Sequence, residues 1–200
     1  MKGPLSHSER RIEAVVVGAS AGGVDALFTL LEGLPADWRL PVAVVIHLPE
    51  SHESRLAEVF GHRLPFPVRE AEDKAPVAAG TLYFAPPGYH LSIERERRFS
   101  LSCEPPVLFS RPAIDVLMAS AADVYGPALA GVLLTGANDD GAQGLLRVHQ
   151  AGGITVVQDP AEALVPTMPR AAIAAHAPDF VLSLRDIRML LLQLDSAHAH

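Results

Sequence analysis

Short apolar runs alternate with amphipathic segments along most of the chain. The runs are rich in β-branched side chains and end at glycine, proline or a polar residue, which is typical of buried strands. The segments between them carry apolar residues at helical spacing, as Leu27, Leu30 and Leu31 do. These patterns predict strands at 14–17, 42–46, 81–85, 130–134, 154–157 and 180–182, and helices at 24–32, 55–60, 113–125, 141–151, 169–175 and 184–194.

The order of these elements predicts the fold class. Strands that alternate with helices favour an α/β fold, with a doubly wound, mostly parallel sheet covered by helices on both faces. The segments 90–93 and 99–102 flank a charged stretch, a pattern typical of a β-hairpin inserted between two units. We predict one catalytic domain at 12–194, preceded by a disordered arm at 1–11 and followed by a tail at 195–200.

Composition narrows the classes of protein that this chain can represent. Its 200 residues are 49% apolar and 20% charged, an ordinary globular mixture, and the formal net charge is -7. An acidic chain disfavours non-specific nucleic-acid binding, which needs a basic face. The longest apolar runs fall far short of the ~20 residues of a membrane span, so we expect no membrane insertion and a cytoplasmic location. The single cysteine, Cys103, permits no intrachain disulfide, which agrees with a reducing compartment.

Candidate chemistry lies in three loops, each directly after a predicted strand. The first is 18–23 (GASAGG), the second begins at His47, and the third is 135–141 (TGANDDG). Open α/β sheets form their sites at the carboxyl ends of the strands, so we expect the three loops to meet. A serine nucleophile needs a histidine to accept its proton and a carboxylate to orient that histidine. Ser20 is the candidate nucleophile, His47 the candidate base, and Asp139 or Asp140 of the third loop the candidate carboxylate; backbone N–H groups of the first and third loops can bind an oxyanion.

Simpler explanations exist for each of these residues. Ser20 and Asp140 can act as helix N-caps, and His47 can be a strand-end histidine bonded to backbone. The glycines of the first loop also suit phosphate binding, but the full dinucleotide motif is missing. The order serine, histidine, aspartate differs from that of the α/β-hydrolases, which share the G-x-S-x-G motif.

Seven segments of the chain match one known family. They are VVVGASAGGVDAL (15–27), HLP (47–49), YFAPPGYHL (83–91), RPAIDVLMASAA (111–122), GVLLTGANDDGAQGL (131–145), AGGITVVQD (151–159) and MPRAAI (168–173). The chain therefore resembles the catalytic domain of the chemotaxis protein-glutamate methylesterases (CheB type) over about residues 12–194.

This resemblance implies a function and its residues. It implies a serine hydrolase that demethylates glutamate γ-methyl esters on methyl-accepting chemotaxis receptors and can also deamidate receptor glutamines. The family's serine, histidine and aspartate fall on Ser20, His47 and Asp140. Asp139 is the neighbour that can be confused with Asp140, which we prefer because it directly precedes Gly141.

The resemblance also implies regulation. Typical members carry a receiver domain, whereas only about eleven residues precede the first predicted strand here. We therefore expect an enzyme that is constitutive or controlled by a separate regulatory protein, unless the sequence was cut from a longer one.

Further residues are candidates for binding substrate. Ala137 and Asn138 stand where the family usually has methionine and glycine, in a loop that borders the site. His90 and Arg170 fall in matching segments; each has an equally good structural explanation, His90 at the edge of the site and Arg170 at a helix start. The remaining histidines have no ligand spacing, so we predict no metal and no cofactor.

Two alternative functions stay open at this point. One is a triad hydrolase that acts on a different protein ester or amide, because of the altered TGANDDG loop. The other is a non-catalytic regulatory module that has lost activity.

Overall fold

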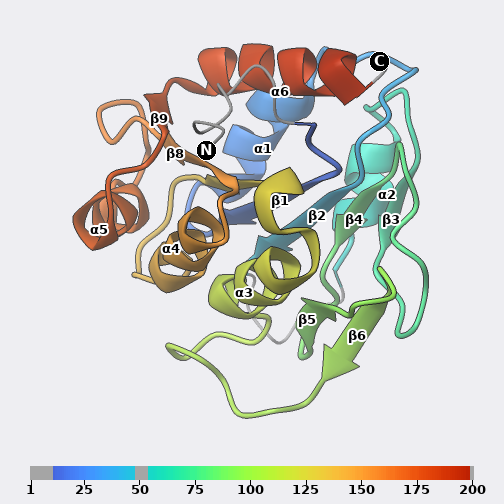
Figure 1. Ribbon diagram of the computed structural model, residues 1–200, viewed down its shortest axis with the longest axis horizontal. Helices are drawn as coiled ribbons and strands as arrows, with labels where there is room; N and C mark the ends of the chain where they lie inside the picture. Colours follow the sequence, from blue (N-terminus) through green and yellow to red (C-terminus); the bar gives the residue numbers. More distant parts are fainter. Residues whose placement is uncertain (1–10, 48–53, 199–200) are drawn as a thin grey trace, which may run out of the picture.

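A computed structural model gives the architecture of the protein and describes residues 11–47 and 54–198 (Figure 1). Seven parallel strands form one sheet in the order β3-β4-β2-β1-β7-β8-β9. These strands are β1 (Ala14–Ala19), β2 (Val42–Ile46), β3 (Val68–Glu70), β4 (Leu82–Phe84), β7 (Leu129–Leu133), β8 (Ile154–Gln158) and β9 (Phe180–Leu182).

Strand β1 lies at the centre of the sheet. The chain adds β2 and β4 on one side of β1, then returns to add β7, β8 and β9 on the other. The order therefore reverses between β1 and β7, and the crevice beyond the carboxyl ends of strands at such a switch point is the usual ligand site of an open α/β sheet. Every residue of β1, β2, β7 and β8 is buried, which explains why these runs are continuously apolar.

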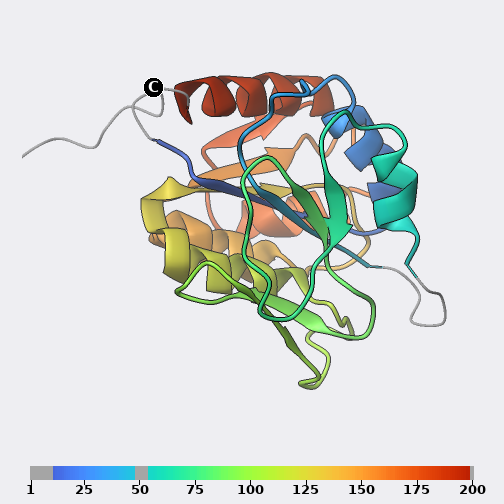
Figure 2. The ribbon, with the colours of Figure 1, turned by 90° about the vertical axis from the view of Figure 1, so that its right-hand side faces the viewer.

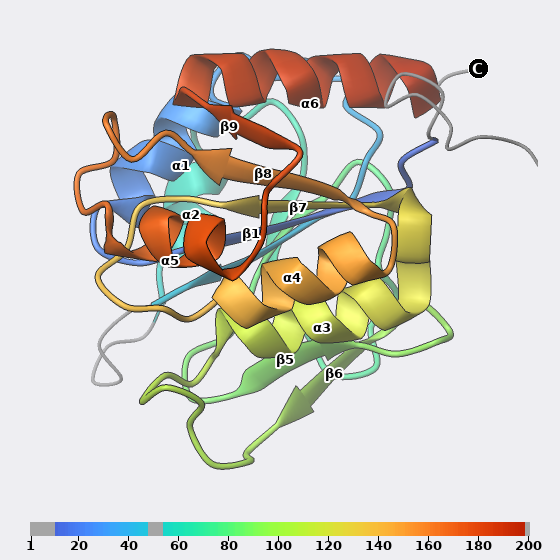
Figure 3. The same ribbon diagram turned by 60° about the vertical axis from the view of Figure 1, so that its left-hand side comes forward.

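Helices cover both faces of the sheet (Figure 3). Val15 and Val17 of β1 point into the core beneath α1, α2 and α6, while Ala14 and Val16 point into the core on the side of α3, α4 and α5. The doubly wound fold predicted from the sequence is confirmed. The helices are α1 (Gly23–Leu31), α2 (Leu56–Gly61), α3 (Ile114–Tyr125), α4 (Ala142–Gln150), α5 (Thr167–Ala175) and α6 (Leu184–His198), with a short 3-10 turn η2 (Gly126–Ala128).

The predicted hairpin is also present. Strands β5 (His90–Ile93) and β6 (Phe99–Ser102) pair antiparallel and form a second, two-stranded sheet. Figure 2 shows this hairpin on the opposite side of the molecule from α6. Leu91, Ile93 and Phe99 are buried in the same cluster as the inner face of α3, so the hairpin extends the core on that side.

The structure differs from the sequence prediction in two elements. Strand β3 was not predicted, because Val68 is its only apolar residue and it lies at the edge of the sheet. Helix α6 runs to His198, so the tail predicted at 195–200 begins too early. Asp195 is buried and accepts the N–H groups of Arg39 and Leu40 at 2.9 and 3.0 Å, which ties this part of the helix to the segment before β2.

Some predictions fall outside the described residues. These are the arm as far as residue 10 and the Leu48–Pro49 part of the HLP motif. Within the residues that are described, no helix is long and apolar enough to cross a membrane.

Candidate active site

Ser20 and His47 follow adjacent parallel strands. Their predecessors Ala19 and Ile46 are register partners, and the N–H of His47 donates to the carbonyl of Ala19 at 3.2 Å. Neighbouring strands lie about 4.8 Å apart, so the two residues leave the sheet side by side. Gly22, with φ of 78°, turns the chain from β1 into α1.

His47 is bonded to Asp140. Its Nε2 lies 2.7 Å from Oδ2 of Asp140, and the two side chains are 13% and 0% exposed. An imidazole that donates Nε2–H to a carboxylate keeps its lone pair on Nδ1, so Nδ1 is the nitrogen left to accept a proton. Asp139 is exposed, so the structure places Asp140 and not its neighbour against the histidine.

Asp140 is held by the first turn of α3. Its Oδ2 also accepts the N–H of Ile114 at 2.7 Å, and its Oδ1 accepts the N–H of Asp115 at 2.9 Å. These N–H groups have no partner within their own helix, and the positive end of the helix dipole favours a carboxylate there. Three hydrogen bonds thus compensate the burial of this charge and set its orientation towards His47.

Asp115 makes the corresponding contact in the opposite direction. Its Oδ1 accepts the N–H groups of Gly141 and Gly144, at 2.9 and 2.6 Å, at the start of α4. Burial raises the pKa of Asp115, an effect that the Gly144 N–H opposes and the charge of Asp140 reinforces. Asp115 was not among the site residues predicted from the sequence. Its place in the first turn of a predicted helix was the available signal, but that signal does not show which helix it caps.

The third loop is bonded to the first. The N–H of Ser20 donates to the carbonyl of Thr135 at 2.9 Å, and the N–H of Gly136 donates to the carbonyl of Val165 at 3.0 Å. These two N–H groups are therefore engaged and not available to an oxyanion. In the part of the chain that the structure describes, the N–H groups of Ala21 and Ala137 have no acceptor, so they remain candidate donors.

With this arrangement established, comparison with known proteins shows where the chain belongs. The family model described as CheB methylesterase matches residues 15–191. The chain belongs to the CheB methylesterase family.

Individual relatives agree with this family. A Leptospira interrogans protein, assigned by its name to the protein-glutamate methylesterase/protein-glutamine glutaminase group, is 45% identical over 92% of this chain and 95% of its own length. The corresponding protein 1 of Hahella chejuensis is 44% identical over 86% of this chain but only 48% of its own length. The crystal structure of the Thermotoga maritima CheB methylesterase catalytic domain superposes with a TM-score of 0.87 at 31% identity, covering 92% of this chain and 98% of that one.

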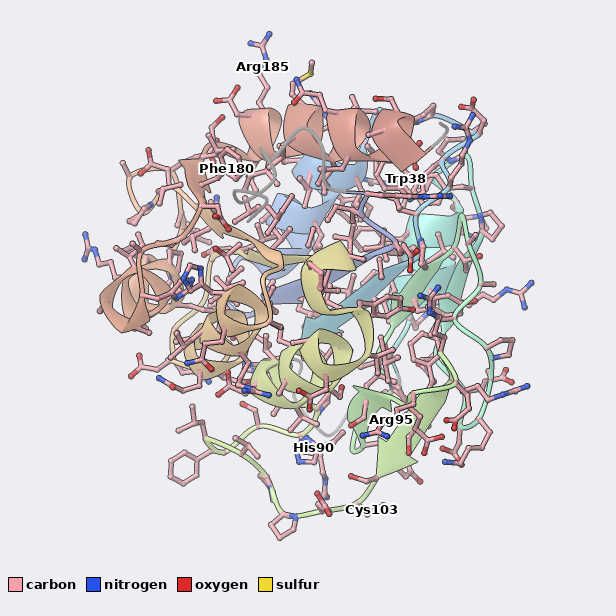
Figure 4. All side chains as sticks on the ribbon, viewed as in Figure 1. Trp38, His90, Arg95, Cys103, Phe180 and Arg185 are labelled. Carbon is pink, nitrogen blue, oxygen red and sulfur yellow. The ribbon has the colours of Figure 1, made fainter. Side chains whose placement is uncertain are left out.

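His90, which lies in one of the matching family segments, is buried beneath the loop that joins β6 to α3 (Figure 4). The N–H of Ala113 donates to its Nδ1 at 3.2 Å, so Nε2 carries the hydrogen and donates to the carbonyl of Pro105 at 3.1 Å. Both ring nitrogens are thus engaged by backbone at the two ends of this loop. The geometry favours the structural explanation for His90, and contact with substrate stays a prediction.

The other candidate binding residues lie at the surface. Arg170 is exposed on α5, and Ala137 is exposed in the third loop. Asn138 is half-buried, and its Oδ1 accepts the N–H of Asp140 at 3.2 Å, which helps to shape the turn before α4. Contact of these three residues with substrate stays a prediction. Over 11–47 and 54–198, no cluster of His, Cys, Asp or Glu is arranged to hold a metal ion.

Proposed function

We propose that this chain is a serine hydrolase that removes methyl groups from glutamate γ-methyl esters of methyl-accepting chemotaxis receptors. The observation that carries the proposal is the 2.7 Å contact between His47 and the buried Asp140, at the strand end next to Ser20, in a chain of the CheB methylesterase family. The names of the relatives support protein glutamate as the substrate residue.

The first half of the reaction forms an acyl-enzyme. Nδ1 of His47 accepts the proton of the Ser20 hydroxyl as Oγ attacks the ester carbonyl. The carbonyl oxygen becomes an oxyanion, which the N–H groups of Ala21 and Ala137 are the candidates to stabilise. The bond to the methoxy group then breaks, the leaving oxygen takes the proton from His47, and methanol departs.

The second half regenerates the enzyme. His47 accepts a proton from water, the hydroxide attacks the acyl carbon, and the bond to Ser20 Oγ breaks as His47 returns the proton to it. The products are the free glutamate carboxylate and the native serine. Asp140 stays ionised throughout, keeps the hydrogen of neutral His47 on Nε2 and stabilises the imidazolium that forms in each half.

Glutamine deamidation is the second candidate activity, because the names of the relatives carry both activities. The same attack on a γ-amide gives the same acyl-enzyme and releases ammonia instead of methanol. An amide is the less reactive substrate, so we expect the esterase rate to exceed the deamidase rate on matched sites.

Two receptor fragments that differ at one side chain test the proposal. One carries a glutamate γ-methyl ester and the other carries glutamine at the same position, and release of methanol and ammonia is measured for each. Methanol release at a rate that rises with the protein concentration supports the methylesterase. If the protein hydrolyses a simple ester but releases no methanol from the methylated receptor fragment, its substrate is a different protein ester or amide. Activity on neither, where the Hahella relative is active, would favour the non-catalytic module.

A further inference from the structure

Thr135 connects the loop of Ser20 to the rest of the site. It is 1% exposed, lies two residues beyond the last residue of β7, and is hydrogen-bonded through its carbonyl, its N–H and its hydroxyl. Its carbonyl accepts the N–H of Ser20 at 2.9 Å, and its own N–H donates to Oε1 of Gln158 at 2.9 Å. Its hydroxyl accepts the N–H of Val165 at 2.9 Å and donates to the carbonyl of Ala21, also at 2.9 Å.

These bonds hold the backbone on both sides of the Ser20–Ala21 peptide. A threonine hydroxyl has a single hydrogen, so it donates to one acceptor at a time. The carbonyl of Ala21 at 2.9 Å is closer than that of Val165 at 3.3 Å, and the incoming N–H of Val165 occupies a lone pair. The orientation of the Ala21 carbonyl therefore depends on the Thr135 side chain.

The segment 159–166 completes this support from the other side. The carbonyl of Val165 accepts the N–H of Gly136, and the N–H of Val165 donates to the Thr135 hydroxyl, so this segment contacts both the side chain of Thr135 and the backbone of Gly136. The segment is anchored in turn by Oε2 of Glu162, which accepts the N–H of Leu184 at the start of α6 at 2.7 Å. The side chain of Thr135 thus joins the loop after β7, the nucleophile loop at Ala21 and the segment 159–166 at Val165.

We propose that Thr135 is a positioning residue, whose hydroxyl holds the Ser20–Ala21 backbone in the conformation that Ser20 needs as a nucleophile. This inference rests on the proposed role of Ser20. A displacement of about 1 Å in a reacting group can lower a rate by about a hundredfold, so a loosened loop has a measurable consequence. Among the described residues, the hydroxyl of Thr135 bonds to the backbone of Ala21 and Val165 and not to the side chains of Ser20, His47 or Asp140.

Three variants separate positioning from general stability. Thr135→Val removes the hydroxyl at nearly constant volume, and Thr135→Ser retains it. Thr155→Val is the matched control, because the fully buried Thr155 hydroxyl donates to Asp179 Oδ2 at 2.9 Å and accepts the N–H of Asp179 at 3.0 Å, on β8 and away from Ser20. The rate of covalent labelling of Ser20 by a fluorophosphonate reports the competence of the nucleophile without any receptor substrate.

We expect Thr135→Val to label about 10- to 100-fold more slowly than the native chain, whereas Thr135→Ser and Thr155→Val label within about threefold of it. Native-like labelling of Thr135→Val, an equal loss in Thr155→Val, or no rescue by serine would each overturn the proposal.

Amide hydrogen exchange supplies a readout that does not depend on catalysis. Thr135→Val should accelerate exchange at 18–23 and 163–168 by more than tenfold relative to Thr155→Val. If the native chain is not labelled at Ser20, the proposed function fails, and exchange alone then decides whether Thr135 holds the loop. Unchanged exchange in Thr135→Val would overturn the positioning role as well.

Discussion

Asp140 accepts hydrogen bonds from the start of α3, the helix that carries Asp115, and Asp115 accepts hydrogen bonds from the start of α4, the helix that follows Asp140. The carboxylate of Asp140, just before α4, accepts two N–H groups from the first turn of α3, and the carboxylate of Asp115, in α3, accepts two from the start of α4. The two helices therefore cap each other through a pair of carboxylates, of which that of Asp140 is fully buried and that of Asp115 is half-buried. This reciprocal arrangement fixes the carboxylate that contacts His47 by means of two helices rather than one loop.

Asp115 should matter as a hydrogen-bond acceptor more than as a charge. Asp115→Asn keeps the Oδ1 acceptor for Gly141 and Gly144, and its free energy of unfolding should stay within about 1 kcal/mol of the native value. Asp115→Ala leaves both N–H groups without their acceptor and should lower the free energy of unfolding by about 1–3 kcal/mol. Urea unfolding measures both variants. An equal loss of unfolding free energy in Asp115→Asn and Asp115→Ala would show that the charge of Asp115, and not its acceptor oxygen, stabilises the fold.

Asp140 should control the tautomer of His47. In Asp140→Asn, the amide NH₂ facing Nε2 would force the ring hydrogen onto Nδ1, which then cannot accept the proton of Ser20. We expect kcat for ester hydrolysis to fall by about 10³- to 10⁴-fold. Asp139→Asn is the matched control, because Asp139 is exposed and next in sequence, and its kcat should stay within about threefold. Loss of activity in the control instead would place the catalytic carboxylate at Asp139.

Gly141 should resist substitution for steric reasons. Its φ is 94°, and a Cβ there would lie 2.5 Å from Leu133 Cδ1 and 2.8 Å from Ile114 Cγ2. Gly141→Ala should therefore unfold at lower urea than the native chain and also lose activity, since Ile114 binds Asp140. Gly88→Ala has the same left-handed backbone, with φ of 78°, but no atom within 4 Å of the new Cβ. Its free energy of unfolding should fall by only about 1–2 kcal/mol, so a loss as large as that of Gly141→Ala would refute the steric argument.

His176 should make the fold sensitive to mild acid. Burial lowers its pKa, and the neighbouring His149 contributes in the same direction. The unfolded chain therefore binds a proton at His176 more readily than the folded one, and this contribution to stability is complete above about pH 6.5 and lost as the pH falls towards the folded-state pKa. His176→Gln should flatten the dependence of Tm on pH between about 7 and 5. An unchanged dependence of Tm on pH in His176→Gln would contradict the assignment.

The sequence predicts that Ser20, His47 and the third loop lie at one edge of the sheet, because all three follow buried strands and parallel strands bring their carboxyl ends together. The structure shows the contact between His47 and Asp140, and the hydrogen bond from the hydroxyl of Ser20 to His47 stays a prediction. The sequence also predicted the hairpin, because the charged segment between its two strands interrupts the alternation of strands with helices. Local patterns and the general rules of α/β sheets are enough to predict the hairpin and the three loops, whereas the choice of Asp140 over Asp139 came from the resemblance to the family.

Other features depend on contacts between distant parts of the chain. Asp115 contacts Gly141 and Gly144 because α3 and α4 pack side by side, and no local pattern encodes that orientation. Thr135 and Val165 are 30 residues apart, and their hydrogen bond exists only once the segment before α5 has folded over the nucleophile loop. His90 lies in a matching segment, yet its burial and its two backbone partners became visible only in the structure.

The most direct test of the proposed mechanism is methanol release from a methylated chemoreceptor fragment by the native chain and by Ser20→Ala. Ser20 is half-buried, and replacing its side chain removes one oxygen atom, so the variant should fold normally by circular dichroism. We predict steady methanol release by the native chain and a loss of at least about a thousandfold in kcat for Ser20→Ala. Methanol release by Ser20→Ala at the native rate would contradict the account, because the nucleophile would then lie elsewhere in the chain.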